Sequence, residues 1–90
     1  MYGPHGTAQA WYDANTAKWE QMGREAVGCN LTMILEKKGN MTRKFKGEIV
    51  EATPCGFRKR PRTVVVQFKI KIRNQTGTER EFTVSKLPRY

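Results

Sequence analysis

Histidine, cysteine and acidic residues are scarce in this 90-residue chain, which holds one histidine, two cysteines and eight aspartates and glutamates. His5, Cys29 and Cys55 are scattered and show neither CxxC nor HxxxH spacing, so the sequence predicts no metal site. The chain has no Ser/His/Asp or Cys/His set and no phosphate-cradling glycine loop. We therefore expect a protein that is not an enzyme and that needs no cofactor.

Long hydrophobic runs are missing as well. No stretch approaches the roughly 18 apolar residues that span a bilayer, and the N-terminus has no basic region followed by an apolar run. We therefore expect a soluble protein of the cytoplasm. Without a secretory signal, two cysteines are more often reduced thiols than a disulfide, although the sequence leaves a pairing of Cys29 with Cys55 open.

Positive charge, in contrast, is abundant and unevenly distributed. Seventeen lysines and arginines give the chain a formal net charge of +9. Residues 1–30 carry a net charge of −1, whereas residues 31–90 hold 15 basic and 5 acidic residues. Such an asymmetry indicates a polyanionic partner, which is a nucleic acid, an anionic membrane or an acidic protein surface.

The clearest structural pattern lies at residues 63–73. From Val64 to Ile72 an apolar residue takes every second position, and Lys69, Lys71 and Arg73 fall between or after them. This period of two predicts a half-buried strand whose apolar side forms the largest part of the core. We expect the three cations to form a row on its exposed side.

The rest of the chain predicts one helix in front of an antiparallel sheet. We expect a loose tail at residues 1–7 and a single domain at residues 8–90, with an amphipathic helix at residues 8–27 that Gly28 ends. A helix start near Asn15 is the alternative, because cap-forming polar residues cluster there. The fold class is α+β, mainly β, with the helix followed by a bent four- to five-stranded antiparallel sheet or a small barrel. The expected strands are residues 31–36, 41–53, 63–73 and 79–86, with a proline-containing loop at 54–62.

The segment Lys46-Gly47-Glu48-Ile49-Val50-Glu51 places a glycine inside a strand, which often marks a bulge or a sharp bend. A bent strand that opens a meander resembles the small SH3-like barrels of the Tudor and KOW type, over roughly residues 31–87. The resemblance implies that this protein is an adaptor that binds nucleic acid or another protein.

The strongest candidate site is the segment 57–62, where four cations occur beside an aromatic residue and a proline. Cations contact phosphates, and an exposed aromatic ring stacks on a base. We expect the segment to continue along and across the sheet as one basic stripe. Its residues are Phe57, Arg58, Lys59, Arg60, Arg62, Lys69, Lys71, Arg73, Arg43, Lys44 and Lys46. The competing interpretation is a solvated turn beside strand lysines that only discourage edge-to-edge aggregation.

The sequence therefore predicts a binding module that contacts nucleic acid, DNA or RNA, through its phosphates. It shows no helix-turn-helix spacing, zinc-finger ligand set or aromatic RNP-type strand that would read a base sequence. The alternative is a small regulatory or inhibitory protein, of the viral or phage accessory type. Its basic face would dock on an acidic surface of a larger host protein, with the helix or Trp11 as the apolar anchor.

Overall fold

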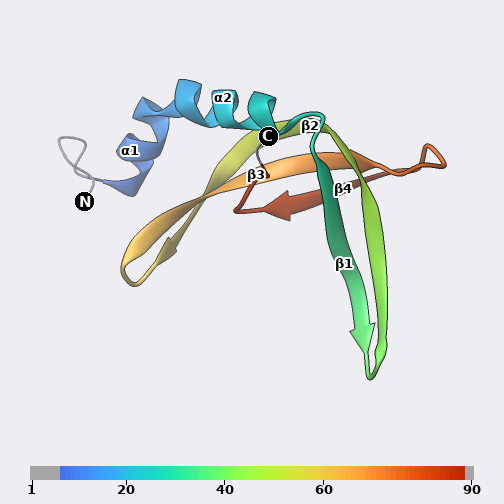
Figure 1. Ribbon diagram of the computed structural model, residues 1–90. Coiled ribbons are helices and arrows are strands. Elements are labelled where there is room, and N and C mark those ends of the chain that lie inside the picture. The colour runs from blue at the N-terminus through green and yellow to red at the C-terminus, as the bar shows by residue number, and fades with distance from the viewer. Residues whose placement is uncertain (1–6, 89–90) are drawn as a thin grey trace.

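The computed structural model describes residues 7–88 and contains two short helices followed by a four-stranded antiparallel sheet (Figure 1). In chain order the elements are α1 (Ala8–Ala14), α2 (Thr16–Ala26), β1 (Asn30–Lys38), β2 (Met41–Arg60), β3 (Thr63–Arg73) and β4 (Glu79–Val84). The strands lie side by side in the order β1-β2-β3-β4. The predicted class, α+β and mainly β, is confirmed. Within residues 7–88 the sheet has four strands and is open, since β1 does not pair with β4.

The predicted loose tail falls mostly on residues 1–6, which lie outside the described part of the chain, as does His5. Thr7, its last residue, caps α1, because its hydroxyl accepts a hydrogen bond of 3.1 Å from the backbone N–H of Ala10. Neither described helix is long and apolar enough to cross a membrane.

The prediction of one helix at residues 8–27 is wrong, because the chain forms two helices that meet at Asn15. Asn15 has φ of −110° and ψ of 19°, and its side-chain amide donates a 2.8 Å hydrogen bond to the carbonyl of Trp11. The indole N–H of Trp19 donates to the carbonyl of Tyr12 at 3.1 Å. A polar side chain that competes for backbone carbonyls thus ends α1 and changes the direction of the chain.

β2 is twenty residues long, and it does not stop at the proline-containing segment. The predicted interruption at residues 54–62 is therefore wrong up to Arg60. The register with β3 shifts at Val50 and again at Cys55, so β2 carries two bulges that bend and twist it. Pro54 lies opposite Phe68, which directs its backbone groups toward β4, so the missing N–H of Pro54 breaks no hydrogen bond.

The core lies between α2 and the inner side of the sheet, and the predicted apolar side of residues 63–73 supplies its centre. Phe68, Ile70 and Ile72 of β3 are fully buried together with Ile49 of β2. The sheet curls around them, since the rings of Phe45 and Phe82 lie 6.0 Å apart although they belong to β2 and β4.

The helix α2 approaches β2 closely. A Cβ on Gly23 would overlap the backbone carbonyl of Ala52, so only glycine permits this distance between helix and strand. Both cysteines are free, Cys29 in the interior and Cys55 exposed at its bulge, which answers the question that the sequence left open.

Candidate nucleic-acid interface

The basic segment after Phe57 forms the end of a two-stranded ribbon. β2 and β3 stay paired as far as Arg60 and Thr63, and only Pro61 and Arg62 make the turn. β4 pairs with β3 only as far as Phe68, so the ribbon of β2 and β3 projects beyond the end of β4 (Figure 1). We call Arg58, Lys59, Arg60 and Arg62 the basic ribbon tip.

The basic ribbon tip is exposed, and none of its four cations forms an ion pair with a carboxylate of the described chain. Because strand side chains alternate, Arg58 and Arg60 lie on one side of the ribbon and Lys59 lies on the other. Positive charge therefore covers both sides of the tip. Four like charges so close together repel one another, and an anion bound between them would relieve that repulsion.

Phe57 lies where the ribbon joins the rest of the sheet. Its ring packs against α1 and is not exposed for stacking on a nucleic-acid base, which differs from the sequence prediction. Its ring lies 5.5 Å from that of Tyr12, which in turn stacks on Trp19 at 6.4 Å. Burial raises the pKa of the Tyr12 phenol above its ordinary value of 10.0, since a partly desolvated site disfavours the phenolate. Phe57 thus fixes the ribbon to α1.

The three cations of β3 all meet carboxylates of neighbouring strands. In sequence order the pairs are Lys69 Nζ with Glu81 (3.4 Å), Lys71 Nζ with Glu51 (3.6 Å) and Arg73 Nε with Glu79 (2.8 Å). We call these three cations the paired ladder. Each cation of the paired ladder has a negative charge beside it, so the expectation of an uninterrupted cationic row on β3 is wrong.

The third predicted group lies on another arm of the molecule. Arg43, Lys44 and Lys46 belong to the part of β2 that pairs with β1, and Arg43 forms an ion pair of 3.6 Å with Glu36. Figure 1 shows the β1–β2 and β2–β3 hairpins ending at separate places, joined by the bent length of β2. The predicted basic stripe is thus divided into the basic ribbon tip, the paired ladder and a separate arm.

Trp11, the predicted anchor for a protein partner, is half-buried. Its ring lies 5.2 Å from that of Trp19, which is buried in the core. Trp11 therefore extends the core, and only part of its surface reaches solvent.

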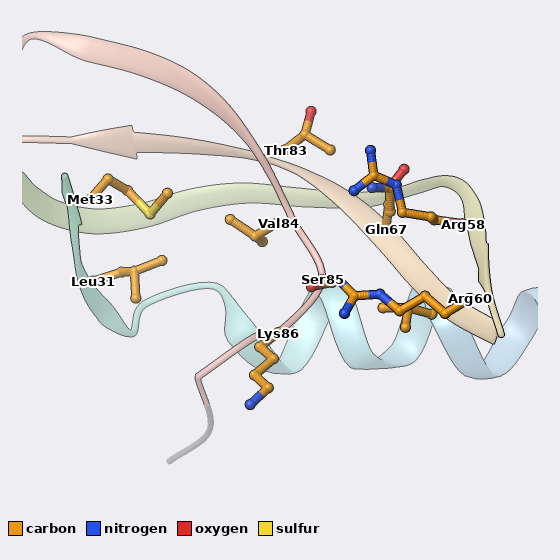
Figure 2. A pocket seen from close by; sticks show the side chains of 10 residues that line it. Leu31, Met33, Arg58, Arg60, Gln67, Thr83, Val84, Ser85 and Lys86 are labelled. Carbon is orange, nitrogen blue, oxygen red and sulfur yellow. The ribbon is translucent and has the colours of Figure 1, made fainter. Parts of the chain in front are cut away.

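Sequence reasoning missed a cavity of about 430 Å³ beside the basic ribbon tip (Figure 2). Arg58 and Arg60 line it together with Gln67 of β3 and Lys86, which follows β4. The cavity exists because β4 covers only the second half of β3. The alternation of apolar and polar residues in the two segments does not predict how far the two strands stay paired.

Nothing in the described chain points to a metal centre, because no three histidine, cysteine, aspartate or glutamate side chains gather between residues 7 and 88. Comparison with known proteins adds no relative, since no family model, curated protein or solved structure matches this chain.

Proposed function

We propose that the protein is a non-enzymatic binding module that holds nucleic acid through phosphate contacts at the basic ribbon tip. The observation that carries this proposal is the difference in pairing. Each cation of the paired ladder has a carboxylate partner, whereas Arg58, Lys59, Arg60 and Arg62 have none among the described residues. A surface that served only solubility would mix both signs of charge at the tip too.

The chemistry of the tip suits phosphates. A guanidinium presents a planar fork of donors that bonds two phosphate oxygens at once, and a lysine adds a point charge. A two-stranded ribbon also has the shape that the major groove of duplex DNA admits, about 12 Å wide. Phosphate contacts position a protein without reading bases, so we expect little dependence on base sequence.

An electrophoretic mobility-shift titration with a duplex oligonucleotide, between about 50 and 300 mM salt, tests the proposal. One variant changes the four residues of the basic ribbon tip to alanine. The matched control changes Lys69, Lys71 and Arg73 of the paired ladder to glutamine. We expect the native chain to bind with a log–log salt slope of about −3.6, which is about −0.9 for each of four phosphates. The tip variant should lose binding and the control should keep it. No shift by the native chain at the lowest salt rejects the proposal.

A further inference from the structure

The first half of β3 has an open edge. β3 pairs with β2 along its whole length, but with β4 only from Phe68 to Arg73. Among the residues that the structure describes, none pairs with residues 63–67 on the side opposite β2. Figure 2 shows the reason, since the chain turns away after Val84 through Ser85 and Lys86.

The backbone groups at this edge can be assigned. The N–H of Asn74 donates to the carbonyl of Thr78 at 3.0 Å, so Asn74 directs its backbone toward β4. Every second residue of an antiparallel strand does the same, and the β3–β4 register stays regular as far as Phe68. Val66 and Val64 continue this series beyond the end of β4. Their N–H and C=O groups therefore point outward, where the next strand of a sheet would lie.

The open edge lies beside the cavity of about 430 Å³. Arg58 and Arg60 line one side of it, and Leu31 and Met33 line the other, with the last residues of β4 between them (Figure 2). Lys86 adds a third cation, and the described lining contains no carboxylate. A strand that enters here meets unpaired backbone groups and a positive surface together.

Exposed strand edges are normally blunted by a charge, a proline or a bulge, because they recruit other strands. β1 has such a device, since its register shifts at Leu35. The free part of β3, in contrast, is Val64-Val65-Val66-Gln67, which has no charge, no proline and no register shift of its own.

We propose that this edge binds an extended acidic peptide segment of another protein, which adds as a fifth strand beside Val64 and Val66. Its acidic side chains would face Arg58, Arg60 and Lys86. A second copy of this chain fits poorly, because it would bring a further net charge of +9 to a positive surface. The inference rests on the backbone edge, which the proposed binding of nucleic acid does not use, but the two proposals share the side chains of Arg58 and Arg60.

Amide hydrogen exchange followed by NMR tests the added strand directly. The probe is a seven-residue peptide in which glutamate alternates with valine. At saturating peptide, exchange at Val64 and Val66 should slow at least about tenfold, because their N–H groups gain partners. Val65 and Gln67 already bond to β2 and serve as internal controls that should change little. Absence of peptide binding, or binding without protection at Val64 and Val66, overturns the proposal.

A pair of variants tests the same edge by affinity. Val64→Pro removes an outward N–H while leaving the bonds to β2, and Val64→Ala shortens the same side chain but keeps the N–H. Val64→Pro should weaken peptide binding about fivefold relative to Val64→Ala, the factor for one net hydrogen bond. Equal affinities of the two variants contradict the proposal. A peptide of the same composition with its glutamates grouped at one end should bind more weakly than the alternating peptide, and equal binding of the two peptides also contradicts the proposal. Both variants keep all cations, so their affinity for nucleic acid should equal that of the native chain. If the native chain binds no nucleic acid, the proposed function fails and the peptide proposal is still tested by the two variants.

Discussion

The basic ribbon tip and the paired ladder both lie on the paired strands β2 and β3 and carry similar numbers of cations, yet their surroundings differ. On the ladder, Glu51, Glu79 and Glu81 stand beside the cations across β2 and β4. At the tip no strand lies beyond β3, so no described carboxylate faces Arg58 or Arg60. The comparison teaches that cross-strand neighbours, more than the number of cations in a segment, decide whether a basic segment remains available to a polyanion.

Charge reversal at the tip should have the largest effect on nucleic-acid affinity. Arg58→Glu with Arg60→Glu removes two phosphate contacts and adds repulsion, so we expect a loss of at least about a hundredfold near 100 mM salt. Unfolding free energy should stay within about 0.5 kcal/mol, because both side chains are exposed and unpaired. Fluorescence anisotropy with a labelled duplex measures the affinity. The control is Lys69→Gln with Lys71→Gln, which should change the affinity less than about threefold. If the control loses as much affinity as the tip variant, the tip and the ladder do not differ in binding.

Removing the carboxylates of the ladder should have a smaller effect of the opposite sign. Glu51→Gln, Glu79→Gln and Glu81→Gln together release three cations on the same side of the sheet, and we expect affinity to rise about tenfold at low salt. Stability should fall by no more than about 1 kcal/mol per exposed pair. The same anisotropy titration and urea unfolding report both quantities. An unchanged affinity would mean that the ladder is out of reach of the bound polyanion.

Phe57→Ala should leave affinity within about twofold and act on stability instead. The ring supports the ribbon through Tyr12, so its loss should cost about 1–3 kcal/mol in urea unfolding, and Phe57→Leu should cost less because it keeps apolar volume. Affinity is compared under conditions where both variants are folded. A loss above about tenfold in a folded Phe57→Ala variant would assign the ring to a stacked base.

Tyr12→Phe should have no effect on affinity, and the difference in unfolding free energy between this variant and the native chain should change with pH only in alkali. Burial raises the pKa of Tyr12 in the folded chain, so above pH 10.0 the unfolded chain releases this proton first. The contribution of Tyr12 to stability is therefore complete below that pH and is lost as pH rises through the folded pKa. Urea unfolding of both proteins from neutral to alkaline pH checks this. Parallel curves would show that the Tyr12 phenol is not desolvated.

Much of the fold follows from local sequence. The alternation at residues 63–73 identified β3 and its buried side, because period-2 patterning needs no knowledge of the neighbouring strands. The turns at Gly39 and Gly77, which have φ of 57° and 87°, suit glycine for conformational reasons that a sequence shows directly.

What the sequence did not show depends on partners far along the chain. Pro54 predicts the end of a strand, but the register places it where β3 offers no acceptor. The sequence predicts unpaired cations on β3, but the pairing of β3 with β4 places Glu79 and Glu81 beside them. The basic ribbon tip itself was identified from composition, since clustered cations need no tertiary information to be recognised.

The most direct test of the central claim is an NMR titration of the native chain with a short duplex oligonucleotide at about 100 mM salt. We predict that the largest amide shift changes fall on residues 58–63 at the basic ribbon tip, with small changes at Lys69, Lys71 and Arg73. Largest changes on the paired ladder, or a uniform pattern over the whole sheet, would contradict the account.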